Sequence, residues 1–198
     1  GLGTALALAR QGANVVLNGF GDTKAPQDAV KSLGVRAGYH GADMSKPAEI
    51  EAMMAYAAAE FGGVDILVNN AGIQHVAAVE DFPPERWDAI IAINLSSAFH
   101  TTRLAIPSMR NKNWGRVINI ASAHGLVASA QKSAYVAAKH GIVGFTKSIA
   151  LETATCGITV NAICPGWVLT PLVQKQIDDR AKREGIDVAQ ANTELLRE

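Results

Sequence analysis

The segment GRVINIAS (115–122) predicts a β-strand that is buried on both faces. Its apolar residues do not alternate with charged ones, a pattern typical of parallel sheets that helices cover on both sides. A helical pattern (133–154) and another apolar strand, ITVNAICPG (158–166), follow it along the chain. A strand, a helix and a strand in this order form a parallel pair. We therefore expect the α/β class, with a doubly wound, mostly parallel sheet in three α/β/α layers.

The same alternation of elements precedes this segment. Pro107 is expected to kink or end a long helix, and residues 167–198, which are helical and charged, predict a lid over the sheet edge. Strands are further predicted at 14–20, 35–43 and 65–72, and helices at the first residues of the chain, at 46–62 and at 84–112.

The composition excludes several classes of function. Of the 198 residues, 48% are hydrophobic, which is enough for one domain around one core. Lys plus Arg (18) balances Asp plus Glu (18), so no net field attracts nucleic acid or an anionic membrane. No run of about 18 apolar residues predicts a membrane helix. Cys156 and Cys164 have neither metal-ligand nor disulfide spacing, so we expect reduced thiols, a cytoplasmic protein and no metal site.

The first residues, GLGTALALARQGANVVL (1–17), begin without Met and inside a helical pattern. We therefore expect a single domain over residues 1–198 that is a fragment of a longer protein. The first strand and the far edge of the sheet would lie outside it. Any signal sequence would have been lost with the start, so its absence carries no information.

Glycine and polar residues gather where the predicted strands end. In doubly wound sheets, ligands bind at the carboxyl ends of the strands. Ordinary turns explain one such cluster better than they explain five at the same edge. The clusters are Asn18–Gly19, Asp43, Asn69–Gly72, Ser122 and Pro165–Gly166.

Three residues around the strand 115–122 suggest acid–base chemistry. Tyr135 and Lys139 are four apart in a predicted helix, so they lie on one face about a turn apart. A lysine ammonium beside a phenol favours the phenolate and lowers the phenol pKa towards the working pH. Ser122 ends the strand at the same edge. Its hydroxyl and the phenol could together bind one substrate oxygen, with Tyr135 as general acid or base.

The chain resembles the short-chain dehydrogenase/reductase family, whose fold is Rossmann-like. The matching motifs are NNAG (69–72), Asn94 in INLSS, Ser122, YVAAK (135–139) and PGWVLTP (165–171), in family order. The resemblance implies that Tyr135 is the catalytic acid/base and that Lys139 tunes it and binds the nicotinamide ribose. Ser122 would anchor the substrate oxygen, and Asn94 would hold a water that links Lys139 to solvent.

The resemblance also implies a dinucleotide cofactor. Gly1 would be the last glycine of the pyrophosphate-binding turn, at a helix N-terminus that favours anions. The segment NGFGD (18–22) contains no Arg or Lys and ends in Asp22, which favours NAD over NADP. The remaining expected cofactor contacts are Phe20, Asp43, Met44, Asn70, Ala71, Gly72, Pro165, Gly166, Val168 and Thr170, besides Tyr135 and Lys139.

The resemblance narrows at positions that the general pattern leaves open. Four segments look like the cytosolic-type D-3-hydroxybutyrate dehydrogenases: AGIQH (71–75), NIASAHGLVAS (119–129), KSAYVAAKHG (132–141) and NAICPGWVLTPLV (161–173). A small hydroxy acid carries a carboxylate that must be paired or hydrogen-bonded once water is excluded. By this resemblance the carboxylate pocket consists of Gln74, His124, Lys132 and Gln176, with Trp167 on the lid side.

Three alternatives are weighed against oxidation of 3-hydroxybutyrate. The chain could act on another small hydroxy acid or on a 3-oxoacyl thioester, or it could sense a dinucleotide without turnover. Ser122 and His124 also suggest a hydrolase, but no G-x-S-x-G elbow surrounds the serine and the Tyr135–Lys139 pair would be idle. Related enzymes are commonly tetramers, so a homotetramer is expected, with helices 84–112 and 133–154 at its contacts.

Overall fold

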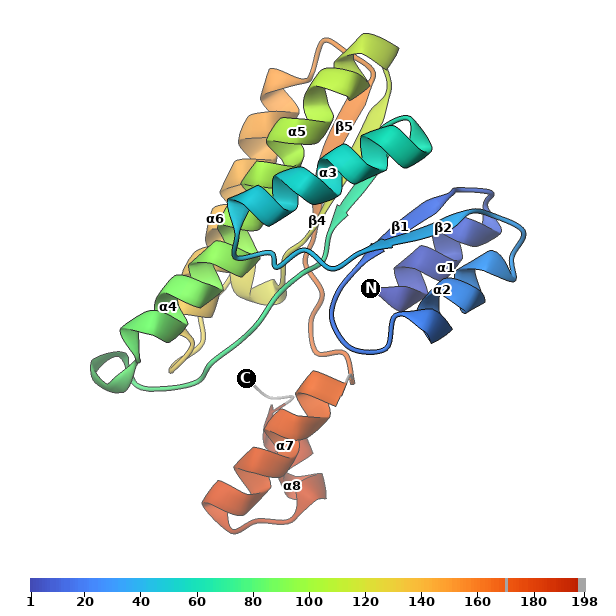
Figure 1. The fold of residues 1–198 in the computed structure, drawn as a ribbon. Coiled ribbons are helices and arrows are strands. Elements are labelled where there is room, and N and C mark those ends of the chain that lie inside the picture. The colour runs from blue at the N-terminus through green and yellow to red at the C-terminus, as the bar shows by residue number, and fades with distance from the viewer. Residues whose placement is uncertain (170, 196–198) are drawn as a thin grey trace.

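A computed structural model of the protein describes residues 1–169 and 171–195. Helices and strands alternate from the N-terminus, and every strand pair in this part of the chain is parallel (Figure 1). The elements are α1 (Leu2–Arg10), β1 (Val15–Asn18), α2 (Lys24–Lys31), β2 (Ala37–His40), α3 (Pro47–Phe61), β3 (Ile66–Asn69), η1 (Val79–Asp81), α4 (Pro84–Ile91), η2 (Ala92–Ser96), α5 (Ser97–Lys112), β4 (Gly115–Ile120), η3 (Ala123–Gly125), α6 (Ser133–Glu152), β5 (Ile158–Ile163), α7 (Pro171–Glu184) and α8 (Val188–Leu195).

The strand β4, which contains most of the segment 115–122, lies at the centre of a three-stranded sheet in the order β3-β4-β5. Its register sets Asn69 of β3 beside Asn119 of β4, and Ile120 of β4 beside Ile163 of β5. The helices α3 and α5 cover this sheet through a shared core that contains Ile50, Met109 and other apolar residues. The parallel α/β class predicted from the sequence is therefore confirmed.

The strand β5 differs from the expectation that every strand is buried on both faces. Ile158 and Val160 are buried, whereas Thr159, Asn161 and Ile163 alternate with them and are exposed. Within the described residues, one face of β5 therefore meets solvent. Its apolar composition alone did not distinguish this arrangement from double burial.

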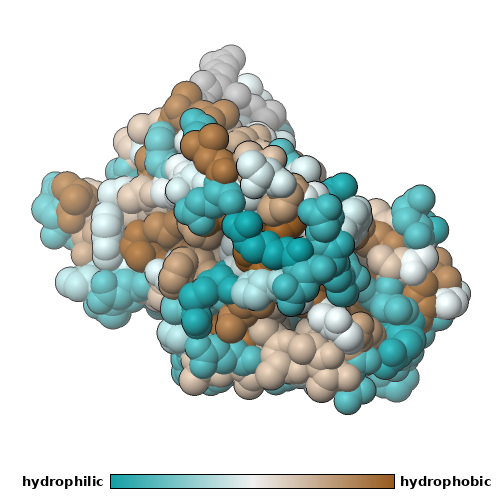
Figure 2. Space-filling view, turned by 90° about the horizontal axis from the view of Figure 1, so that it is seen from above, coloured by the Kyte–Doolittle hydropathy of each residue, from teal (hydrophilic) through white to brown (hydrophobic). Residues whose placement is uncertain are grey.

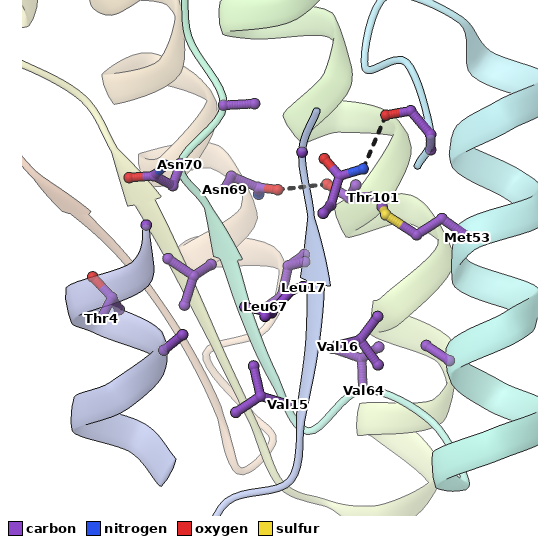
Figure 3. Close-up of a pocket in the computed structure, with 18 of the residues that line it drawn as sticks. Thr4, Val15, Val16, Leu17, Met53, Val64, Leu67, Asn69, Asn70 and Thr101 are labelled. Carbon is purple, nitrogen blue, oxygen red and sulfur yellow. Dashed lines mark hydrogen bonds between the residues drawn. The ribbon is translucent and has the colours of Figure 1, made fainter. Parts of the chain in front are cut away.

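A second difference is that the strands form two sheets rather than one. The strand β1 pairs only with β2, and β3 pairs only with β4, so the edges of β1 and β3 face each other across a cavity of about 860 Å³. Figure 3 shows Val15, Leu17 and Leu67 among the apolar side chains that line it. An additional parallel strand would pair at these two edges, so the prediction of a strand before residue 1 stays a prediction with a defined place in the fold.

The helix predicted at 84–112 is interrupted at a different place from the one expected. Pro107 lies inside α5, which continues to Lys112, so the proline does not end the helix. The interruption is instead the π-helical turn η2 at Ala92–Ser96, which separates α4 from α5 and contains Asn94. Single π turns within helices are frequent at functional sites.

The helices α7 and α8 form a hairpin below the carboxyl ends of the strands (Figure 1). The hairpin has its own small core of Ile177, Ala181, Ala191 and Leu195, against which Trp167 packs. Arg180 of α7 forms ion pairs with Glu184 and with Glu194 of α8. The predicted lid region therefore folds as a helical unit that is joined to the body through the segment containing Trp167.

The surface at the end opposite the hairpin mixes hydrophilic and hydrophobic side chains (Figure 2). The brown, apolar groups on this face are separated by teal, hydrophilic ones, so no continuous apolar face covers it. Among the described helices, none is both long and apolar enough to cross a membrane.

Candidate active site

Ser122 lies directly beyond the carboxyl end of β4, where the chain leaves the sheet and enters η3. Its Oγ accepts a hydrogen bond from the backbone N–H of His124 at 3.2 Å and therefore caps this short turn. The next residue, Ala123, donates its N–H to the carbonyl of Pro165 at 2.8 Å. The ends of β4 and β5 are thus tied together, and Ser122 is placed beside the Pro165–Gly166 turn.

Tyr135 and Lys139 project from the first turns of α6 towards the same point. The Tyr135 hydroxyl is hydrogen-bonded to the Ser122 hydroxyl, and Lys139 Nζ lies 5.6 Å from the centre of the Tyr135 ring. Lys139 is only 4% exposed, and its Nζ donates to the carbonyl of Ile120 at 2.7 Å. The structure therefore brings together three of the four residues that the sequence predicts to be catalytic, and Asn94 is the fourth.

The protonation state of the pair differs from the sequence expectation. Burial raises the pKa of Tyr135 above its usual value, although its hydrogen bond with Ser122 opposes the shift. Burial also lowers the pKa of Lys139 to about 8, while the nearby Cys164 thiol raises it slightly. The expectation of a phenol pKa below its ordinary value is wrong for this arrangement, because the desolvation of the phenolate outweighs its hydrogen bond with Ser122.

Asn94 is buried in the π turn, but its carboxamide is already engaged. Its Oδ1 accepts from the N–H of Ile73 and its Nδ2 donates to the carbonyl of Ile73, both at 2.9 Å. Both ends of the side chain therefore hold the loop that follows β3. A Cβ added to Gly72 in this loop would lie 3.6 Å from Asn94 Oδ1 and 3.9 Å from Lys139 Nζ, so the loop passes close to Lys139.

The residues predicted to bind the substrate carboxylate form a connected set. The rings of His124 and Tyr135 are 6.0 Å apart, and those of His124 and Trp167 are 6.1 Å apart, both edge to face. Lys132, which is 5% exposed, has its Nζ 4.9 Å from the centre of the Trp167 ring. A buried cation and a histidine therefore flank Trp167 next to the Tyr135 phenol.

A second cavity, of about 870 Å³, lies between the body and the α7–α8 hairpin, and Lys132 lines it. Gln74 from the loop after β3 and Gln176 from α7 also line it, and Gln176 Nε2 donates to Gln74 Oε1 at 3.0 Å. These glutamines are 102 residues apart in sequence, so the packing of the hairpin against the body makes them neighbours. The cavity has the size typical of small-molecule sites.

The predicted cofactor residues gather at the open end of the cavity between β1 and β3. This edge fits the pyrophosphate of a dinucleotide because Gly1 is the N-cap of α1, and helix N-termini favour anions. A Cβ added to Gly1 would lie 3.2 Å from Asn70 Nδ2. Gly21, with φ of 91°, turns the chain beyond β1. The predicted residues that line the cavity are Gly1, Phe20, Asp43, Met44, Asn70, Ala71 and Gly72.

The other predicted cofactor residues follow β5. Pro165 and Gly166 lie beside η3, as the Ala123 hydrogen bond requires, and Val168 is 55% exposed next to them. Thr170 lies outside the described residues. Asp22, which favoured NAD in the sequence, accepts hydrogen bonds from the N–H groups of Lys24 and Ala25 and therefore caps α2.

A buried polar network, which sequence reasoning missed, lies one layer below the site. Asn69 Nδ2 donates to Asn119 Oδ1, and Asn119 Nδ2 donates to Thr146 Oγ1, each at 2.8 Å. Thr101 Oγ1 donates to Asn69 Oδ1 at 2.7 Å. The network joins α5, β3, β4 and α6, the elements that position the candidate residues. An Asn at the same place in two strand segments was its only sequence signal.

The chain belongs to the short-chain dehydrogenase family, because the family model of that description matches residues 1–181. A D-beta-hydroxybutyrate dehydrogenase of Cupriavidus necator is 73% identical to it over 200 aligned residues, which cover 100% of this chain and 78% of the relative. A protein of the same description from Rhizobium meliloti is 60% identical, over 99% of this chain and 78% of its own length.

Solved structures agree with the Rossmann-like fold. An NAD⁺-bound xylitol dehydrogenase superposes with a TM-score of 0.86 at 31% sequence identity, over 92% of this chain and 72% of its own. A variant of actinorhodin polyketide ketoreductase with NADPH superposes with a TM-score of 0.90 at 34% identity, over 96% of this chain and 74% of its own. One neighbour thus holds NAD⁺ and the other NADPH, so the likeness by itself leaves both coenzymes open.

Proposed function

We propose that the protein oxidises D-3-hydroxybutyrate to acetoacetate with NAD, reversibly. The observation that carries this proposal is that the candidate acid/base lies next to the residues predicted to bind the substrate carboxylate. Tyr135 is hydrogen-bonded to Ser122, and its ring contacts the ring of His124. The His124 ring also contacts the Trp167 ring, and the buried ammonium of Lys132 lies over that Trp167 ring. The printed names of the two relatives at 73% and 60% identity support the same substrate.

The acid–base step is assigned to Tyr135. When bound, NAD supplies the nicotinamide ring that accepts the hydride from C3 of the substrate. Tyr135, as phenolate, takes the proton of the 3-hydroxyl, while the Ser122 hydroxyl donates a hydrogen bond to the same oxygen. The charged Lys139, 5.6 Å from the ring centre, favours the phenolate during this step. In the reverse direction the phenol returns the proton to the carbonyl oxygen.

Substrate orientation is assigned to the pocket beside Trp167. A carboxylate removed from water must be paired or hydrogen-bonded, and Lys132 supplies the positive charge while Gln74 and Gln176 supply amide donors. Anchoring the carboxylate at one end and the hydroxyl at the other leaves one configuration of C3 with its hydrogen towards the nicotinamide. This is a proximity effect that selects the D isomer.

The preference for NAD rests on the cavity beyond β1. Among the described residues that line this cavity, none is Lys or Arg, and the Asp22 carboxylate is one of them. Lys24, the nearest lysine in sequence, is paired with Asp28 at 2.6 Å. The 2′-phosphate of NADP would therefore meet a negative charge with no cation to pair it.

The location and assembly are proposed on separate observations. Cys156 and Cys164 are free thiols, which supports the reducing cytoplasm. Phe99 of α5 is 48% exposed and Leu151 of α6 is 80% exposed, which supports burial of these helices in a homotetramer. Sedimentation velocity tests the assembly, since a monomer at assay concentration would contradict it.

The assay follows absorbance of the reduced nicotinamide after mixing the protein with D-3-hydroxybutyrate and NAD. We expect turnover with the D isomer and NAD, and far less with the L isomer or with NADP. Reduction of a 3-oxoacyl thioester in preference to acetoacetate would favour the alternative substrate class. Binding of NAD without turnover of any of these compounds would indicate a dinucleotide sensor and contradict the proposal.

The pH dependence of oxidation and of reduction follows from the titration of the Tyr135–Lys139 pair. Burial raises the pKa of Tyr135, and the pKa of Lys139 is about 8, so the first proton leaves the pair near pH 8. Oxidation needs the phenolate with charged lysine, so its kcat/KM should rise about tenfold per pH unit from about pH 6 and level off above about pH 8. Reduction needs the doubly protonated pair and should fall above the same point.

The variant Lys139→Met provides the internal check. Without the lysine, the phenol titrates alone with its raised pKa, so the bend in the oxidation profile should move to higher pH. An unshifted bend in this variant, or an oxidation rate that does not change between about pH 6 and about pH 8, would refute the assignment of the titration to this pair.

A further inference from the structure

Gln131 has an unusual backbone conformation next to the proposed carboxylate pocket. Its φ is +61°, in the left-handed region that residues other than Gly, Asn and Asp rarely adopt. Asn113 is the other such residue among those described, and it ends α5, where left-handed residues are common. Gln131 instead precedes α6, and its side chain is exposed, so side-chain packing does not account for the conformation.

The left-handed turn gives Gln131 two effects on the pocket. Its carbonyl accepts a hydrogen bond from the N–H of Ala77 at 3.0 Å. Ala77 is three residues beyond Gln74, in the loop that follows β3. The next residue after Gln131 is Lys132, which begins α6 as its N-cap and is 5% exposed. One residue therefore connects the loop that contains Gln74 to the lysine on the opposite side of the same cavity.

We propose that Gln131 is a positioning residue for substrate specificity. Its left-handed backbone holds the Ala77–Gln131 hydrogen bond, and this bond fixes the distance between the amide of Gln74 and the ammonium of Lys132. The proposal rests on the proposed function, because these two groups are assigned to the substrate carboxylate. A preformed pocket loses less freedom when the small anion binds, so the affinity for the carboxylate depends on this turn.

The test replaces Gln131 by residues that differ in their tolerance of positive φ. Gln131→Val, which is β-branched, should raise KM for D-3-hydroxybutyrate by about fivefold to tenfold. Gln131→Asn, which tolerates this conformation, should keep the wild-type KM. The matched control is Ala130→Val, an exposed neighbour in the same turn whose φ is not positive, and it should also behave as wild type.

Two further readouts separate positioning from a general structural role. In Gln131→Val, KM for NAD, kcat, the unfolding temperature and KM for the uncharged methyl ester of 3-hydroxybutyrate should change by less than about twofold or by a few degrees. A wild-type KM for the acid in this variant would overturn the proposal. Equal losses for the acid and the ester, or for NAD, would also overturn it, because they would indicate a loosened fold.

Hydrogen exchange of the Ala77 amide tests the hydrogen bond independently of activity. The amide should exchange slowly in the wild-type protein and in Gln131→Asn, and rapidly in Gln131→Val. Equal protection in all three proteins would overturn the proposal, whatever the substrate. Slow exchange that Gln131→Val abolishes, in a protein that does not oxidise 3-hydroxybutyrate, would support the hydrogen bond and contradict only the proposed function.

Discussion

Replacement of Tyr135 by phenylalanine is expected to lower kcat for D-3-hydroxybutyrate oxidation by about 10²- to 10⁴-fold, the range attributed to a positioned acid or base. The change deletes the phenolic oxygen that is hydrogen-bonded to the Ser122 hydroxyl and that we propose exchanges a proton with the substrate. The ring remains and keeps its edge-to-face contact with His124, so the pocket should keep its shape. The measurement is steady-state kinetics, with the dissociation constant of NADH determined by fluorescence.

The matched control is Tyr56→Phe. Tyr56 lies on α3, where its ring contacts His40 and Phe61, away from the candidate site. Its loss of a hydroxyl should leave kcat within about twofold of the wild-type value. A Tyr135→Phe enzyme that retains more than about a tenth of wild-type kcat, with chemistry shown to limit the rate, would exclude Tyr135 as the acid/base.

Replacement of Lys132 by methionine is expected to raise KM for D-3-hydroxybutyrate by about 10- to 200-fold, since a charge-assisted hydrogen bond contributes about 1.5–3 kcal/mol. Methionine keeps an unbranched apolar chain near Trp167 and removes the ammonium that lies 4.9 Å from its ring centre. KM for NAD should stay unchanged.

Lys175→Met is the control for this prediction. Lys175 lines the same cavity between the body and the hairpin, but it is exposed on α7. Its substitution should change KM for the acid by less than about twofold. If both variants raise KM for D-3-hydroxybutyrate equally, the effect comes from the overall positive charge of the cavity and not from Lys132 itself. A wild-type KM in Lys132→Met would refute the carboxylate assignment.

The sequence predicted the class of fold because the pattern of its strands is local information. Segments rich in apolar residues that do not alternate with charged ones, such as 115–122, indicate buried parallel strands, and β4 lies at the centre of its sheet. The same signal failed for β5, whose exposed face depends on what covers the sheet rather than on the strand itself. The break between β1 and β3 is likewise a property of pairing, which composition does not encode.

Rules that predict structure from single residues were less reliable where the backbone adopts a different conformation from the expected one. Pro107 was expected to kink or end the helix 84–112, but the helix continues past it and is interrupted at the π turn that contains Asn94. The two hydrogen bonds between Asn94 and Ile73, one donated by each residue, span 21 residues of the chain, so no periodicity in the sequence could reveal them. The sequence pattern also did not predict the helix α2, whose first N–H group donates a hydrogen bond to Asp22.

The candidate site was predictable mainly through the resemblance to a family. Its motifs placed Ser122, Tyr135 and Lys139 together, and the structure joins them through the Ser122 hydroxyl and the Lys139 ammonium. The contact of Gln74 with Gln176 spans 102 residues and needs the folded hairpin. The direction of the Tyr135 pKa shift could not be predicted, because it depends on the burial of the phenol in the folded site, which outweighs its hydrogen bond with Ser122.

The most direct test of the whole account follows the hydride itself. D-3-hydroxybutyrate with deuterium at C3 is oxidised in the presence of NAD, and the reduced nicotinamide is analysed by mass spectrometry and proton NMR. The account predicts that the deuterium appears on the nicotinamide ring, on one face only, and that Tyr135→Phe slows the transfer by about 10²- to 10⁴-fold. Acetoacetate formed without deuterium on the nicotinamide, or no acetoacetate at all, would contradict it.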